Sequence, residues 1–422
     1  MTRHLLFLLL SITAITASAQ KTDRLIREKK VRQLLATLSS DEMQGRKPLT
    51  PGIEKAAAFI SAEFARAGLK PLQDGGGFLQ SFSTFGASVT RQSLQLNGVE
   101  TAPSDFIPFP SQEEVDWDGR GGEVVLLKKG SGNAIQEFLP MLQGQKDLLV
   151  VADTTLRREL GRLRNFRMQR MGGSGTVILV FHPGPVDRYR ARVTSQIRRF
   201  EYANVVGVIP GKGKPDERVL FSAHYDHLGI GKAVQQDSIY NGANDDASGT
   251  SAVIALARYF SKGTRPERTL VFAAFTAEES GGYGSQYFSR QMDPDKVVAM
   301  FNIEMIGTES RWGRNSAYIT GYEKSDFGKI LQENLSGTAF SFHPDPYPAQ
   351  NLFYRSDNAT LARLGVPAHT ISTSKMDSEK FYHTVDDELG TLDTRNMTEI
   401  IKAIAVASRS IVDGRSTPAR VK

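Results

Sequence analysis

The sequence predicts an α/β protein with a doubly wound, mostly parallel sheet flanked by helices, and with an inserted β-rich module. Two observations lead to this prediction. From about residue 204 onward, long apolar strands alternate with helices, which is the pattern of a parallel sheet covered on both faces. Between about residues 86 and 203, the chain instead has short strands separated by turn signals.

The N-terminal residues have the pattern of a secretory signal peptide. Arg3 and His4 precede a short apolar run, and small residues then lead to Ala19. The run is too short to span a bilayer comfortably, and no later segment qualifies as a span. We therefore expect residues 1–19 to be removed by cleavage after Ala19, which would leave a secreted or periplasmic protein without an integral membrane segment. An uncleaved membrane anchor is the alternative.

Two helices and a hairpin are predicted next along the chain. Apolar residues recur every three or four positions over 24–38 and 54–67, and Pro51-Gly52 predicts a break between these helices. We assign residues 20–85 to an N-terminal helical part of the main domain. The Asn97-Gly98 pair predicts a hairpin turn in the inserted module, residues 86–203.

The main α/β domain is predicted to take residues 204–422. Buried strands are predicted at 205–209, 219–223, 270–275, 297–303 and 366–371. Helical periodicity occurs at 249–260, 283–291, 327–335 and 394–412. This alternation predicts the parallel sheet, because parallel strands need a crossover connection that is usually a helix.

The composition excludes several kinds of site. The 422-residue chain has no cysteine, so disulfides, thiol nucleophiles, thiolate zinc sites and iron–sulfur clusters are all excluded. The formal net charge of +6 is mild for this length and does not predict a nucleic-acid partner. No pattern specifies an oligomeric state.

Histidines and carboxylates follow the predicted strands of the main domain. They are His224 and Asp226 after 219–223, Asp245 in the next loop, Glu278 and Glu279 after 270–275, Glu304 after 297–303, and His383 after 366–371. Because ligands bind beyond the carboxyl ends of the strands in such sheets, we expect these side chains to converge. Imidazole and carboxylate ligands suit zinc, and one carboxylate can bridge two ions.

Each residue also has a simpler interpretation. A histidine after a strand can be a hydrogen-bonded turn residue, Asp245-Asp246 can be a charge pair favoured at a helix N-terminus, and Glu278-Glu279 can be a solvated loop. Coincidence at several successive strand ends is much less probable than coincidence at one. His182, His343 and His369 have no comparable carboxylate company, and we interpret them as structural or surface residues.

Four segments resemble the motifs of the M28 family of dizinc metallopeptidases, which are largely aminopeptidases. They are Ala223-His-Tyr-Asp-His227, Gly242-Ala-Asn-Asp-Asp-Ala-Ser-Gly249, Ala277-Glu-Glu-Ser-Gly-Gly-Tyr-Gly-Ser285 and Tyr382-His-Thr-Val-Asp386. Arg355-Ser-Asp357 is a weaker fifth. The resemblance covers about residues 24–85 and 204–412, and residues 86–203 resemble the protease-associated insert of some relatives.

The resemblance implies a first metal position. His224 would bind one zinc ion, and Asp226 would orient its ring. Asp245 would bridge this ion to a second one. The peptide bond between Asp245 and Asp246 is expected to be cis, as in relatives. Glu304 would bind the same ion as His224, although relatives more commonly carry aspartate at this position.

The resemblance also implies a second metal position and a base. Glu279 and His383 would bind the second zinc ion, which makes two ions per chain. Glu278 would act as the general base, taking a proton from water and returning it to the leaving amine. Substrate contacts would come from Tyr354, Asp357 and Tyr382.

The function that the resemblance implies is that of a secreted, zinc-dependent aminopeptidase acting on the N-terminal residues of peptides. One alternative is a glutaminyl-cyclase-like acyltransferase, which shares the fold and generally uses one zinc ion. Another is a weakly catalytic protein that binds metal or peptide. The sequence has no G-x-S-x-G elbow and no H-E-x-x-H motif, which argues against a serine hydrolase and a single-zinc peptidase of that type.

Overall fold

The computed structural model describes residues 22–73, 75–128, 133–165 and 168–422. The predicted signal peptide, residues 1–19, lies outside the described residues and stays a prediction. Within the described ranges, no helix combines the length and the apolar character that a bilayer-spanning helix requires.

The chain divides into two compact units. Of the described residues, one unit takes those up to Ser81 and from Tyr202 onward, and the other takes those between Phe82 and Glu201. The sequence analysis placed the inserted module at 86–203, so the two divisions differ by only a few residues. Strands β2 (Leu79–Leu96) and β10 (Tyr189–Ile209) carry the chain from one unit to the other.

The first unit is built on a mixed, mostly parallel sheet with the strand order β17-β16-β18-β15-β11-β14-β10. Its strands are β11 (Lys214–His224), β14 (Arg268–Phe275), β15 (Val297–Ile303), β16 (Ser316–Ile319), β17 (Ser341–Pro344) and β18 (Ala368–Ser372). Strands β18, β15, β11 and β14 run parallel, whereas β10 and β16 pair antiparallel with their neighbours β14 and β18. The predicted mostly parallel sheet is confirmed.

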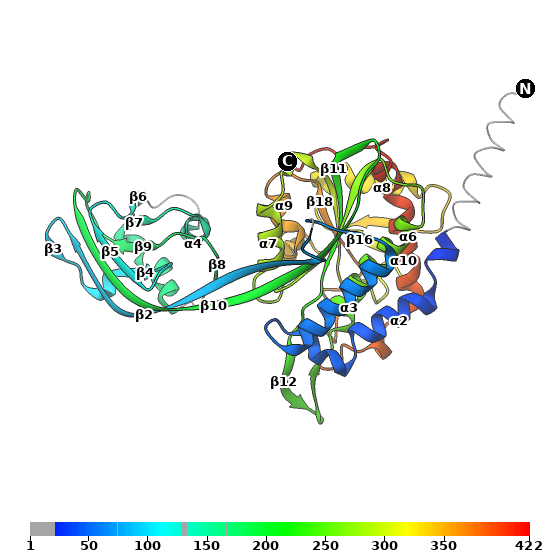
Figure 1. The fold of residues 1–422 in the computed structure, drawn as a ribbon, viewed down its shortest axis with the longest axis horizontal. Helices are drawn as coiled ribbons and strands as arrows, with labels where there is room; N and C mark the ends of the chain where they lie inside the picture. The colour runs from blue at the N-terminus through cyan, green and yellow to red at the C-terminus, as the bar shows by residue number, and fades with distance from the viewer. Residues whose placement is uncertain (1–21, 74, 129–132, 166–167) are drawn as a thin grey trace, which may run out of the picture. The chain divides into compact units, whose positions relative to one another are not determined.

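Helices cover both faces of this sheet, as Figure 1 shows. Alternate residues of β11 separate the two cores: Phe221 packs with α2, α3, α6, α8 and α10, and Leu220 packs with α7 and α9. The helices are α2 (Glu28–Leu38), α3 (Pro51–Ala67), α6 (Gly249–Ser261), α7 (Tyr283–Arg290), α8 (Phe327–Asn334), α9 (Asn358–Ala362), α10 (Thr394–Ala407) and α11 (Arg409–Val412). Since strands alternate their side chains between faces, continuous apolar runs such as β11 belong in the middle of a sheet covered on both sides.

The break between the two N-terminal helices was predicted at Pro51-Gly52, but it lies earlier in the chain. Pro51 is the first residue of α3, and the break between the two N-terminal helices is the turn η1, Asp41–Arg46. Proline is well suited to a first helical position, because the backbone N–H that it lacks would have no partner there. The N-terminal segment also contributes the short strand β1 (Lys70–Pro71).

The second unit has a smaller mixed sheet with the order β4-β9-β7-β6. Its strands are β4 (Phe106–Phe109), β6 (Glu123–Leu127), β7 (Leu148–Ala152) and β9 (Val177–Phe181), with α4 (Ala134–Gln143) and α5 (Arg157–Leu160) packed against them. Leu96 pairs with Val99 of β3 (Val99–Glu100) around the predicted Asn97-Gly98 turn. Both turn residues have positive φ, which this type of hairpin requires. β5 (Glu114–Asp118) and β8 (Arg170–Met171) complete the unit.

Candidate metal centre

The candidate site lies at the carboxyl ends of three neighbouring strands. β11 runs between β14 and β15 in the sheet and ends at His224, which pairs with the last residue of β14. Glu278 follows the end of β14, and Glu304 follows the end of β15. The sheet therefore brings these three side chains to one edge, although up to 80 residues separate them in the sequence.

Asp245 lies in the middle of this edge. It belongs to the turn η5 (Ala243–Ser248), and its peptide bond to Asp246 is cis, as expected from the sequence. The carboxylate of Asp387 accepts hydrogen bonds from the backbone N–H groups of Asn244 and Asp245, which fixes the turn. Oδ1 of Asp245 lies 3.1 Å from His224 Nε2, and Oδ2 lies 3.3 Å from His383 Nε2. The two oxygens of one carboxylate thus face two different imidazoles.

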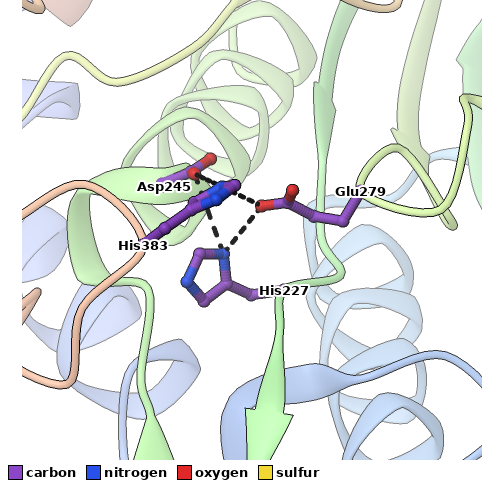
Figure 2. A group of neighbouring side chains, drawn as sticks. All are labelled: His227, Asp245, Glu279 and His383. Atoms are coloured by element: carbon purple, nitrogen blue, oxygen red, sulfur yellow. Dashed lines mark hydrogen bonds and ion pairs between the residues drawn. The ribbon is translucent and has the colours of Figure 1, made fainter.

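Three side chains cluster with Asp245 on the side of its Oδ2 atom: His227, Glu279 and His383. Figure 2 shows this group of four. Oε1 of Glu279 lies 3.0 Å from both His227 Nδ1 and His383 Nε2. One ligand atom from each residue can be chosen so that all four atoms lie within 4.8 Å of one another. The sequence analysis gave His227 no role, although it stands directly beside Asp226 in the same motif.

Asp226 organises the turn that carries the two glutamates. Its buried carboxylate accepts hydrogen bonds from the backbone N–H groups of Glu278, at 3.0 Å, and Glu279, at 3.3 Å. His224 Nδ1 lies 3.1 Å from the backbone oxygen of Asp226 and 3.7 Å from its carboxylate. Asp226 can therefore orient His224, as expected, and it also holds the Glu278-Glu279 turn against the end of β11.

The environment of Glu278 and Glu304 favours the protonated acids in the absence of a cation. Burial raises the pKa of Glu278 well above its ordinary value, His224 opposes the shift, and the charge of Glu304 adds to it. Burial also raises the pKa of Glu304 to about 7, against the opposing effect of His224. Both glutamates line the same cleft.

Carboxylates outnumber cationic groups around this edge. Burial raises the pKa of both Asp357 and Asp387 to about 6, and it raises that of Asp246 well above the ordinary range. Buried carboxylates are costly unless a positive charge compensates them. A divalent cation bound between imidazole and carboxylate ligands would provide that charge, so the residues present fit zinc.

Arg46 is a buried guanidinium near these carboxylates, and the charges of Asp387 and Asp245 oppose the lowering of its pKa by burial. It donates hydrogen bonds to the backbone oxygens of Tyr225, Asn241 and Gly242, which lie in the segments leading to the site. It therefore ties the end of β11 to the turn that carries Asp245. Sequence reasoning missed Arg46 and Asp387, because their partners are backbone groups far away in the chain.

A cleft that is partly open to solvent is lined by four carboxylates, those of Asp245, Glu278, Glu279 and Glu304. The other lining residues are Met305, Tyr318, Thr320, Leu352, Arg355, Ser356, Thr370, Ser372, Ser374, Met376 and Tyr382. Of the three expected substrate contacts, Tyr382 lines the cleft. Tyr354 packs against Phe353 and Arg363, Asp357 is buried, and neither of the two lines the cleft.

Comparisons of the sequence point to one family. The model of peptidase family M28 matches residues 204–408. A probable zinc metalloprotease of Pyricularia oryzae is 31% identical over 159 residues, which cover 36% of this chain and 31% of that protein. A probable leucine aminopeptidase of Trichophyton verrucosum is 27% identical over 229 residues, covering 51% of this chain and 57% of that protein. The chain thus spans less than two thirds of the length of either relative.

Solved structures agree on the fold. A zinc aminopeptidase from Bacillus subtilis superposes with a TM-score of 0.54 and 15% identity, covering 93% of this chain and 97% of that one. A glutaminyl cyclase from Bacteroides thetaiotaomicron superposes with a TM-score of 0.50 and 12% identity, covering 93% and 99%. Both enzymes share the α/β architecture described above.

Proposed function

We propose that this chain, whose residues 204–408 belong to peptidase family M28, is a zinc-dependent aminopeptidase. The observation that carries the proposal is the cluster of two imidazoles and two carboxylates beyond the carboxyl ends of the strands, in which His227 and Asp245 are buried. The two relatives described above are a metalloprotease and an aminopeptidase by name. Peptides are therefore the substrate class that we propose.

Two zinc ions per chain are the metal content that we propose. The two carboxylate oxygens of Asp245 face different imidazoles, and this supports the number of ions. Oδ1 faces His224, and Oδ2 faces His383. A carboxylate in that position is suited to bridge two cations. The first ion would be held by His224, Asp245 and Glu304, and the second by Asp245, Glu279 and His383.

We assign the proton transfer to Glu278. Zinc in such a site lowers the pKa of water toward neutrality and polarises a peptide carbonyl. The Glu278 carboxylate lines the cleft beside the proposed ligands but makes no ion pair with a histidine among the described residues, which leaves its oxygens available for a proton. It would take the proton of the attacking water and return it to the departing amine.

The free N-terminus of the substrate is the group that we expect the site to require. A protonated amine needs an anionic or carbonyl-rich surface, and the lining of the cleft includes carboxylates. Met305, Leu352 and Met376 also line the cleft, which favours an apolar first side chain over a charged one.

Peptides with free and acetylated N-termini test the direction of cleavage. We expect the purified zinc protein to release single residues from free peptides and to leave acetylated ones intact. Cleavage within acetylated peptides would contradict the proposal. A peptide beginning with glutamine separates the cyclase activity, because that reaction yields pyroglutamate and ammonia instead of a free amino acid.

We also propose that the mature protein is exported. The support is the basic, apolar and small-residue pattern of residues 1–19. N-terminal sequencing of the protein recovered outside the cytoplasm should begin at Gln20. Recovery of the protein only from the cytoplasm, with residues 1–19 still attached, would contradict this proposal.

A further inference from the structure

His227 brings a fourth ligand atom to the Oδ2 side of Asp245. The four residues of Figure 2 come from four separate segments: the end of β11, the turn η5, the turn after β14 and the loop after β18. His227 Nδ1 lies 3.0 Å from Glu279 Oε1 and 3.8 Å from Asp245 Oδ2. His383 Nε2 lies 3.0 Å and 3.3 Å from the same two oxygens.

These four distances are close to four of the six edges of a small coordination tetrahedron. Zinc binds imidazole nitrogen and carboxylate oxygen at about 2.0–2.2 Å, so the ligand atoms of a tetrahedral ion lie about 3.3 Å apart. The observed separations of 3.0 to 3.8 Å bracket that edge. Two histidines and two carboxylates are also a ligand set that zinc accepts.

The ring of His227 is held in place at this position. The side chain is fully buried, and within the described residues Nε2 has no hydrogen-bond partner, so Nδ1 makes the polar contacts of the ring. Gly242 packs directly against it: a Cβ at that position would lie 2.5 Å from the ring carbons. The chain thus uses a glycine to admit an imidazole beside the carboxylates.

We propose that His227 is a metal ligand that completes a four-ligand protein site with Asp245, Glu279 and His383. The inference rests on the proposed function in one respect, because both assume that zinc binds at this edge of the sheet. Closed four-ligand sites hold structural zinc, whereas catalytic sites keep a position for water or substrate. On this assignment the two positions differ, because the His224 side has three protein ligands and the His227 side has four.

Both sides of the site reach the cleft. Glu279 of the four-ligand side and Glu304 of the three-ligand side line it, whereas His227 does not. The ring of Tyr382, which also lines the cleft, stacks on that of His383 at 3.8 Å between centroids. The fully buried His227 would therefore complete its metal position from the interior of the protein and not from the cleft.

Metal retention by His227→Ala tests the proposal without an activity assay. The wild-type protein and the variant are loaded with zinc, dialysed against graded chelator and analysed for metal content. The wild-type protein should lose its two ions at different chelator concentrations. In the variant the more tightly held ion should be released at a chelator concentration at least about tenfold lower. His182→Ala, which changes a histidine of the other unit, should match the wild-type protein.

Cobalt substitution and imidazole rescue distinguish a ligand from a hydrogen-bond partner. Four-coordinate Co²⁺ absorbs visible light much more strongly than Co²⁺ with more ligands, so His227→Ala should change the intensity of the bands. Added imidazole should restore part of the spectrum, because it can occupy the space of the missing ring. His227→Asn, with circular dichroism to verify folding, repeats the measurement with a smaller change in packing.

The outcomes separate this inference from the proposed function. Unchanged zinc retention and an unchanged cobalt spectrum in both variants would overturn the assignment and leave His227 as a hydrogen-bond partner of Glu279. A wild-type protein that holds two ions of different affinity but cleaves no peptide would overturn the proposed function and leave the inference intact. A wild-type protein that binds no zinc would overturn both.

Discussion

The two units of the chain both contain parallel strands that are buried along their whole length, yet among the residues that the structure describes only the first unit gathers imidazoles and carboxylates at the strand ends. In the second unit, β7 is followed by Asp153, which accepts a hydrogen bond from the backbone of Thr155 as a helix cap. In the first unit, β11 ends at His224, and Glu278 and Glu304 follow β14 and β15. His224 is buried, and burial raises the pKa of both glutamates. The carboxyl end of a strand therefore does not indicate a site by itself. Imidazoles and carboxylates that converge there in a buried environment do.

Buried arginines make the same contrast. Arg170 in the second unit donates to the backbone oxygens of Phe109, Pro110 and Gly175, and burial lowers its pKa to about 10. Arg46 in the first unit also donates to backbone oxygens, but Asp245, Asp226 and Asp387 lie near enough to oppose the effect of burial on its pKa. Both arginines hold backbone segments together. Only Arg46 does so beside an excess of carboxylates.

The largest effect is expected from Asp245→Asn, because Asp245 faces both proposed metal positions. The variant should lose most of both ions, and activity should fall by more than about 10⁴-fold, beyond the range of a single lost proton transfer. Metal analysis and peptide assays measure the two losses. Asp153→Asn at the end of β7 should change neither quantity. If the Asp245 variant kept its full metal content, Asp245 would not differ from Asp153 in metal binding, and the contrast between the two strand ends would be wrong.

Glu278→Gln should separate metal binding from chemistry. The amide has nearly the shape of the carboxylate but cannot accept the proton, so kcat should fall by roughly 10²–10⁴ while both ions remain. Steady-state kinetics and elemental analysis of the same preparation test this expectation. The exposed Glu137→Gln in the second unit is the matched control. Near-normal turnover would direct the base assignment to another carboxylate, with Asp246 as the next candidate.

Glu304→Ala tests the three-ligand side of the site. If Glu304 binds metal, the variant should retain one ion per chain and lose most of its activity. Glu304→Asp restores the carboxylate that relatives more commonly carry, so it should retain more metal than the alanine variant. If both variants hold two ions, Glu304 is a buried acid and not a ligand. In that case the alanine variant should lose only about 1–3 kcal/mol of stability.

The smallest effect concerns His369, a buried imidazole of the first unit that lies outside the cluster. Burial lowers its pKa to about 4, and the Thr320 carbonyl partly opposes the shift. Because the folded-state pKa lies below the unfolded value of about 6.5, the neutral ring favours folding above that pH, and the contribution is lost as pH falls toward 4. When pH falls from 7.5 to 5, the contribution of His369 to the free energy of unfolding should decrease by about 2 kcal/mol.

Urea denaturation of the wild-type protein and of His369→Gln at both pH values measures that contribution. The difference in stability between the two proteins should change with pH, since only one of them can gain this proton. A pH dependence that is the same in both would mean that the ring is already protonated or solvated in the folded protein. Burial would then not lower the pKa of this histidine.

Local patterns were sufficient to predict most of the central sheet. The cores of β11, β14 and β15 are largely apolar runs of strand length, which is typical of strands that are covered on both faces. The short strands β16 and β17 were not predicted. They have four residues each and lie at the outer end of the sheet, so neither length nor periodicity distinguishes them from loops.

The sequence by itself determined which chemical groups are available at the site: imidazoles and carboxylates without any thiol, at successive strand ends, in an order that resembles one family. Only the tertiary structure decided their partners. Asp226 supports the glutamate turn, Asp387 fixes the turn of Asp245, and His227 joins Glu279, and none of these pairings has a local sequence signal. The physical reason is that a strand pattern specifies burial within a few residues, whereas the distance between two side chains depends on strand order, which the packing of the whole sheet selects.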